Sequence, residues 1–131
     1  MSLTRIYLLA IGGFFAVFGI AYLVRPAEFA ALAELQLPSS TALIEVQGFY
    51  GGQLLALGLL MLLGGWWPRF AFTGLLVAAT SLGGTAIGRI LGVIAQGTCP
   101  PAIAAALLVE TTGACLAVFL LRQDSREASE T

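Results

Sequence analysis

The sequence contains no lysine and no histidine, and charged residues make up only 10% of it. A soluble domain needs a much more highly charged surface than this. The absence of histidine removes the commonest ligand for haem or zinc and the commonest general base. We therefore expect neither a metal nor another cofactor. A net charge of −1 also argues against nucleic-acid binding, which needs a basic face.

Cysteine is scarce as well. Cys99 and Cys115 are separated by 16 residues. If Cys115 lies deep in a helix that begins near Pro101, the two sulfurs are roughly 20 Å apart by helical rise. That distance excludes a disulfide within one chain. We interpret both cysteines as small apolar residues, and they do not indicate a redox compartment.

Hydrophobic residues make up 59% of the 131-residue chain and are concentrated in four long runs. Each run is long enough to cross a bilayer core of about 30 Å. The sequence predicts one all-α domain, a transmembrane four-helix bundle with a short interfacial helix between the first two spans. The expected spans are 3–24, 41–66, 70–95 and 102–121, the interfacial helix covers 27–37, and a polar tail covers 122–131.

The arginines predict an orientation. Four spans place both termini on the same side of the membrane, and that side carries Arg5, Arg69, Arg122 and Arg126, whereas the other side carries Arg25. The positive-inside rule then places both termini in the cytoplasm. We expect a multi-pass protein of the inner membrane, with the lipid bilayer as its first partner.

Glycines recur at four-residue spacing in two of the spans. Gly48 and Gly52 form one such pair, and Gly84, Gly88 and Gly92 form a longer stripe in the third span. Small residues at this spacing allow close packing of membrane helices. We expect the first pair to receive a neighbouring helix, and the stripe to be a packing face through which a homo-oligomer could form.

One arginine, Arg89, lies inside an apolar run, where a charge costs at least a few kcal/mol without a partner. Glu45 and Glu110 also lie inside apolar runs. Counted from the non-cytoplasmic surface at 1.5 Å per residue, all three residues lie at similar depths. We expect Arg89 and Glu110 to pair across the short turn between the last two spans, with Glu45 as a third member.

The predicted Glu45–Arg89–Glu110 cluster has two interpretations. It can fix the register of the helices, because breaking a buried ion pair is costly. Alternatively, two acids against one arginine leave one carboxylate in surplus, and a carboxylate in apolar surroundings can be kept protonated for acid/base chemistry. In that case these three residues are the catalytic candidates. The candidates for substrate binding or hydrogen bonding around them are Gln47, Tyr50, Gln53, Thr85 and Thr111.

These residues also carry a resemblance. The motif Glu45-x-x-Gly48-x-Tyr50-Gly51-Gly52, together with Gly88-Arg89 and Glu110, resembles the small bacterial membrane proteins grouped as domain-of-unknown-function family 4345. The resemblance covers nearly all of the chain beyond the first span. It implies a compact four-helix membrane protein, and it implies no activity.

Three functions remain open. The first is an acid/base enzyme, of isomerase, cyclase or epoxide-opening type, acting on a lipophilic small molecule that enters from the bilayer. The second is a non-catalytic lipid-binding or assembly subunit of a membrane complex. The third is a small proton-coupled transporter that uses the two glutamates as protonation sites. A closed apolar pocket that reaches both acids would favour the enzyme.

Overall fold

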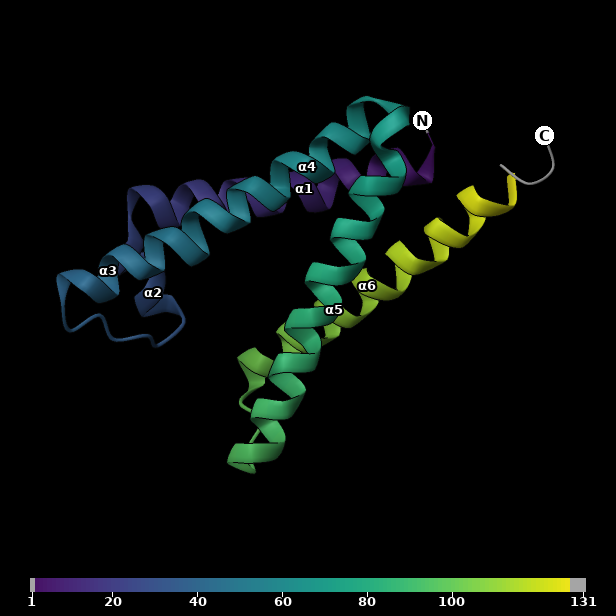
Figure 1. The fold of residues 1–131 in the computed structure, drawn as a ribbon. Coiled ribbons are helices and arrows are strands. Elements are labelled where there is room, and N and C mark those ends of the chain that lie inside the picture. The colour runs from purple at the N-terminus through teal and green to yellow at the C-terminus, as the bar shows by residue number, and fades with distance from the viewer. Residues whose placement is uncertain (1, 128–131) are drawn as a thin grey trace.

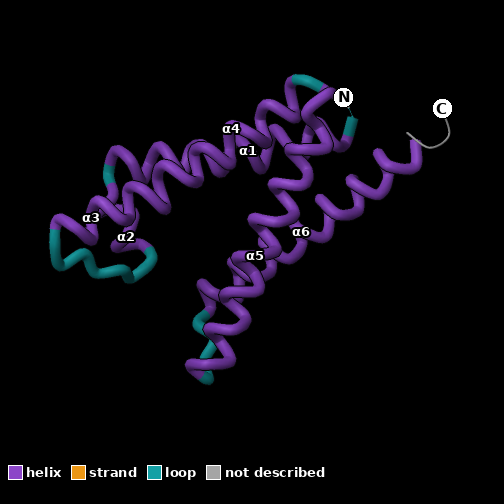
Figure 2. The backbone as a smooth tube through the Cα atoms, viewed as in Figure 1, coloured by secondary structure: helices purple, strands orange, loops and turns teal. Residues whose placement is uncertain are grey.

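The computed structural model describes residues 2–127, and this part of the chain is helical apart from short connections (Figure 2). Within it, four segments are long and apolar enough to cross a membrane: Leu3–Val24, Ser40–Trp66, Pro68–Gln96 and Pro101–Gln123. The expected spans differ from these by at most two residues at any end. The prediction of an all-α, four-span fold is confirmed. The last residues of the predicted polar tail, 128–131, lie outside the described residues.

The helices begin where proline or a capping serine allows it. Pro26, Pro68 and Pro101 each occupy the first position of a helix, where the missing N–H costs nothing. The side chain of Ser2 accepts a hydrogen bond from the backbone of Arg5 at the start of the first helix. The elements are α1 (Leu3–Val24), α2 (Pro26–Leu32), α3 (Ser40–Val46), the π-helix η1 (Gln47–Gln53), α4 (Leu54–Trp66), the 3₁₀-helix η2 (Pro68–Phe70), α5 (Ala71–Gln96) and α6 (Pro101–Glu127).

The interfacial helix ends sooner than expected. The prediction extended it to residue 37, whereas α2 ends at Leu32. The backbone N–H of Leu35 donates to the carbonyl of Ala30 at 2.9 Å, and that of Glu34 donates to Ala31 at 3.0 Å. These two bonds form a Schellman motif, with Glu34 in the left-handed region at φ 57°. The motif closes the helix and directs the chain into the loop that leads to α3.

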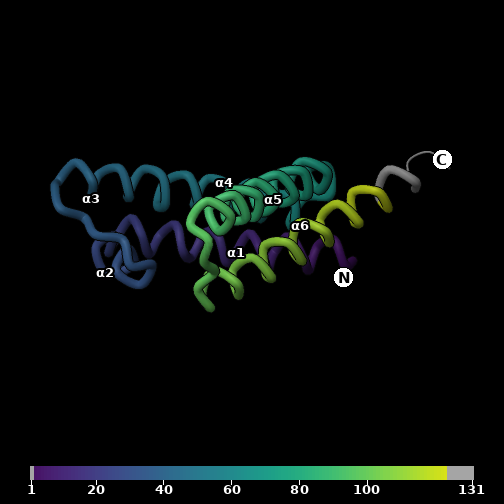
Figure 3. The backbone as a smooth tube through the Cα atoms, turned by 90° about the horizontal axis from the view of Figure 1, so that it is seen from below, coloured from purple at the N-terminus to yellow at the C-terminus, as the bar shows by residue number. Residues whose placement is uncertain are grey.

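The four spans pack as two antiparallel pairs. Helices α1 and α4 form one pair, and α5 and α6 form the other. Figure 1 shows that the pairs meet near the end that carries both termini and diverge from there. Viewed from below, α2 and α3 lie at the opposite end of the first pair (Figure 3). The two pairs therefore share contacts at one end only.

The α1–α4 pair is in backbone contact because glycines line its interface. A Cβ atom on Gly12, Gly19 or Gly58 would lie 2.8, 2.5 and 2.5 Å, respectively, from a backbone nitrogen of the facing helix. Gly51 and Gly65 face leucine side chains of α1 in the same way. Gly12 and Gly19 are seven residues apart, as are Gly51, Gly58 and Gly65. A seven-residue spacing is nearly two full helical turns and keeps these glycines on one face.

The glycines at four-residue spacing receive no neighbouring helix among the described residues. Nothing lies within 4 Å of a Cβ built on Gly48, and a Cβ on Gly52 meets only the carbonyl oxygen of Gln47 in its own helical segment, at 3.9 Å. The prediction that this pair receives a neighbouring helix is wrong. Gly84, Gly88 and Gly92 also have nothing within 4 Å. The seven-residue repeat, which the sequence reading passed over, supplies the contact instead.

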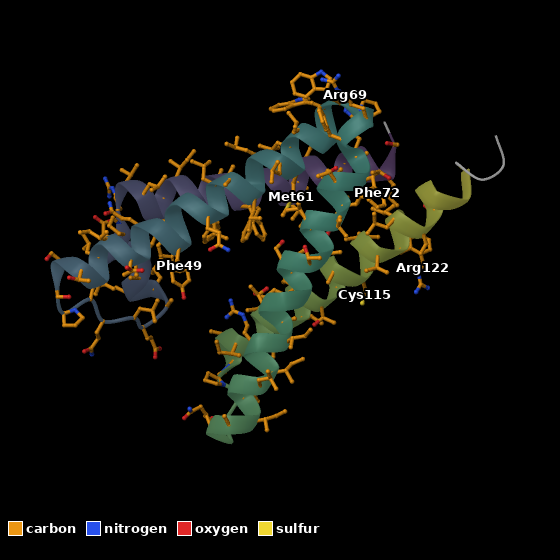
Figure 4. All side chains as sticks on the ribbon, in the orientation of Figure 1. Phe49, Met61, Arg69, Phe72, Cys115 and Arg122 are labelled. Atoms are coloured by element: carbon orange, nitrogen blue, oxygen red, sulfur yellow. The ribbon has the colours of Figure 1, made fainter. Side chains whose placement is uncertain are left out.

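The core lies where the two pairs meet. Leu8, Met61, Leu75 and Leu120 are fully buried there, one from each of the four long helices. Figure 4 shows Met61 on α4 near its crossing with α5. The hydroxyl of Tyr7 donates to the backbone carbonyl of Gly113 at 2.8 Å, which links the first helix to the last.

We predict that Gly12→Ala destabilises the protein whereas Gly13→Ala does not. The added methyl group at position 12 would clash with the backbone of α4, whereas position 13 is open. The free energy of unfolding, measured by detergent titration, should fall by about 1–3 kcal/mol for Gly12→Ala, as for other overpacked interiors. Gly13→Ala should be neutral or slightly stabilising, because alanine favours helix. Equal losses for the two variants would contradict the role given to the glycine contact.

Candidate functional site

The centre of the candidate site is an ion pair between α5 and α6. These helices are antiparallel and joined by a short turn, in which Gly97 adopts a left-handed conformation at φ 66°. Arg89 lies seven residues before the end of α5, and Glu110 lies nine residues after the start of α6. The two side chains are therefore level with each other. The Nε of Arg89 donates to both Oε1 and Oε2 of Glu110, at 3.0 Å each.

The two members of the pair differ in exposure. The side chain of Glu110 is 12% exposed, whereas that of Arg89 is 39% exposed. One N–H group serves both carboxylate oxygens, so the terminal nitrogens of Arg89 remain as donors. Among the described residues, no acceptor forms a hydrogen bond with them. The ion pair was expected to be enclosed among helices. Glu110 is enclosed in this way, whereas Arg89 is not.

Glu45 does not join this pair. It is exposed on α3, near the outer end of the α1–α4 pair, and it forms no ion pair with the described residues. The structure therefore shows an Arg89–Glu110 pair in place of the expected three-membered cluster. The depth count placed the three residues level with one another, but the two helix pairs diverge (Figure 1). Residues at similar depth on different pairs are consequently far apart laterally.

None of the five predicted binding residues forms a hydrogen bond with the ion pair, although Thr85 and Thr111 lie close to it along α5 and α6. The side-chain amide of Gln47 donates to the carbonyl of Leu23 at 3.0 Å, which ties η1 to α1. The hydroxyl of Thr85 donates within its own helix, to the carbonyls of Ser81 and Leu82. The ring of Tyr50 packs on Tyr22 with centroids 5.3 Å apart. The side chains of Gln53 and Thr111 are exposed.

A groove lies beside Arg89, and sequence reasoning missed it. It has a volume of about 290 Å³, opens to the outside and is lined mostly by apolar atoms. Its wall is formed by the last turns of α5, the connecting turn and the start of α6: Arg89, Gly92, Val93, Gln96, Thr98, Pro100 and Ile103. The arrangement places a polar group with unused donors at the edge of an apolar surface.

The comparison with known families agrees with the resemblance noted in the sequence. The chain matches the family described as Domain of unknown function (DUF4345) over residues 3–121, nearly its whole length. The chain belongs to this family. No curated protein and no solved structure matches it. The description of the DUF4345 family names no activity.

A second feature of this DUF4345 protein was also absent from the prediction. Residues Gln47–Gln53 form a π-helix within the second span. Such widened turns are rare and are frequently found at functional sites. The available signal was the cluster of Gly48, Gly51 and Gly52, because glycine tolerates a change in helical winding. In this structure the π-helix packs against the end of α1 rather than against the ion pair.

We predict that the Arg89–Glu110 pair of this DUF4345 protein contributes a measurable coupling energy. A double-mutant cycle with Arg89→Gln and Glu110→Gln, followed by unfolding in detergent, should give about 1–3 kcal/mol. The control is the Arg25–Glu28 pair, whose side chains are both 65% exposed. Exposed pairs of this kind contribute less than about 1 kcal/mol. If both cycles gave the same coupling, the pair would not hold α5 and α6 in register.

Proposed function

We propose that this protein binds a lipophilic molecule, without catalysis, in the groove beside the Arg89–Glu110 pair. The observation that carries the proposal is the position of the arginine at the edge of that groove. The groove has a volume of about 290 Å³ and an apolar lining, and Arg89 lies on its wall with terminal nitrogens that form no hydrogen bond with the described residues. An amphiphile from the bilayer would satisfy both surfaces at once.

The charge of the pair indicates which polar group the ligand carries. Arg89 and Glu110 neutralise each other, so an anionic ligand would add an uncompensated charge to an apolar region. A neutral acceptor oxygen, such as that of an ester or a ketone, would accept from the terminal N–H groups without this cost. The favoured ligand is therefore a hydrocarbon chain or ring that bears one uncharged acceptor oxygen.

The other two functions predicted from the sequence gain less support. The acid/base enzyme requires Glu45 and Glu110 at one cavity, and these residues lie on different helix pairs. In addition, both oxygens of Glu110 are held by Arg89 at 3.0 Å. The proton-coupled transporter also requires two glutamates on one path. Binding needs only the groove and the pair, and both of these are present.

The exposed stripe of Gly84, Gly88 and Gly92 supports a second role in assembly. It has no neighbour within the chain and is open on α5. In a membrane, a face of this kind allows another helix to approach closely. A second copy of the chain is the partner we propose for it.

We predict that a diazirine-tagged palmitic acid methyl ester, activated by light in detergent micelles, labels the groove. Mass spectrometry should locate the label near Val93 and Ile103, which line it. Arg89→Gln should reduce this labelling about fivefold or more, the effect expected for the loss of one or two hydrogen bonds. The control Arg25→Gln, which alters an exposed arginine at a distance from the groove, should leave it unchanged.

The same probe series tests the ligand class. With the wild-type protein, the methyl ester should outcompete both the free acid and an alkane of equal length. With Glu110→Gln the guanidinium is no longer neutralised, so the preference should shift toward the free acid. The binding proposal fails if the alkane labels the groove as well as the ester does. It also fails if Arg89→Gln labels as strongly as the wild type.

We further propose that the protein lies in the inner membrane with both termini in the cytoplasm. The support is the concentration of arginines at the end that carries the termini, under the positive-inside rule. Green fluorescent protein fused to the C-terminus should fluoresce, and alkaline phosphatase fused there should be inactive. A fusion made after Leu37 should report the opposite side. An active phosphatase at the C-terminus would reverse the orientation.

A further inference from the structure

A second cavity lies at the other end of the molecule, where the helix pairs meet. It has a volume of about 390 Å³, and it is bounded by the start of α1, the end of α4, the turn into α5 and one residue of α6. Its polar lining comes from Ser2, Thr4, Arg5 and Gln123, whereas Trp66 contributes to its apolar side. This volume lies within the range of small-molecule sites.

The charged side chain that lines this cavity is positive. Arg5 lines it, and none of the four acidic side chains that the structure describes does so. Two other arginines of this end, Arg69 and Arg122, have side chains that the structure describes, and both are directed elsewhere. The guanidinium of Arg69 lies over the ring of Phe70, 4.6 Å from its centroid, and Arg122 points away from α1 in Figure 4. Among the side chains that the structure describes, Arg5 is therefore the cation available to a ligand in the cavity.

The neighbouring groups are suited to an oxyanion. The Oγ of Ser2 accepts from the backbone N–H of Arg5 at 3.3 Å, so its own O–H remains free to donate. The hydroxyl of Thr4 and the side-chain amide of Gln123 provide further donors on the same lining. A guanidinium with hydroxyl and amide donors around it matches the tetrahedral oxygens of a phosphate group.

The position in the membrane and the sign of the charge identify the source of the phosphate. Trp66 lies on the cavity wall, and tryptophans of membrane proteins favour the level of the lipid head groups. No described carboxylate is present to receive an ammonium group. We propose that this cavity binds the phosphate of an anionic phospholipid with an uncharged head group, such as phosphatidylglycerol, with Arg5 as the principal ligand. This site is separate from the groove at Arg89, and each can fail without the other.

The chain itself supplies the probe for a test. It contains two tryptophans, so Trp67→Phe leaves Trp66, on the cavity wall, as the only one. In neutral detergent, phosphatidylglycerol with brominated acyl chains should quench Trp66 fluorescence at about tenfold lower concentration than brominated phosphatidylcholine. This ratio corresponds to one charge-assisted hydrogen bond. Inorganic phosphate, added as a competitor at millimolar concentration, should not displace the brominated phosphatidylglycerol, because the site is proposed for a lipid and not for free phosphate.

Variants distinguish the site from general attraction to a basic surface. Arg5→Gln should remove the preference for phosphatidylglycerol, whereas Arg25→Gln, at the opposite end, should keep it. Arg5→Lys retains the charge without the planar fork and should give an intermediate preference, which also guards against a failure of Arg5→Gln to fold. Equal quenching by the two lipids in the wild type would overturn the proposal. An undiminished preference in Arg5→Gln, or displacement by millimolar phosphate, would do so as well.

Discussion

The backbone contact between α1 and α4 is the constraint on which the rest of the structure depends. Gly12, Gly19 and Gly58 allow the two helices to approach until a single added Cβ would clash with the facing backbone. Lipid chains are as apolar as leucine, so membrane helices gain little from hydrophobic burial against each other and associate through close van der Waals packing. This pair is consequently the framework, and the turn at Trp67 and Pro68 fixes the point from which α5 departs.

The core that joins the two helix pairs is confined to their junction. Large side chains from all four long helices are fully buried there, and the bond from Tyr7 to Gly113 adds a polar link between α1 and α6. Farther from the termini, the described residues form no comparable core between the two pairs. Each pair must then hold itself together. In the outer half of α5 and α6, the Arg89–Glu110 pair connects the two helices.

The sequence was sufficient to predict the four spans. Of the two glutamates expected beside Arg89, it correctly predicted Glu110 and not Glu45. Apolar runs and prolines are local signals, and the short turn between α5 and α6 is what places Arg89 and Glu110 level with each other. The prediction for Glu45 was wrong because depth gives no information on the lateral distance between elements that are not joined by a short turn. The glycine contact was missed for a related reason. Four-residue spacing is the familiar pattern, yet the α1–α4 pair uses a seven-residue repeat, and the sequence does not show which face meets a partner.

The geometry of the ion pair bears on whether this site is suited to binding or to acid/base catalysis. A general acid or base must exchange a proton with its substrate, and each proton that Glu110 took up would cancel the negative charge that faces Arg89. That change would leave a guanidinium without its counter-charge in an apolar environment, which is costly. Donation from the terminal nitrogens of Arg89 to a neutral oxygen leaves the existing pair intact. A ligand-binding role therefore uses the site as it stands, whereas catalysis by Glu110 would first have to disrupt the contact that holds α5 and α6 in register.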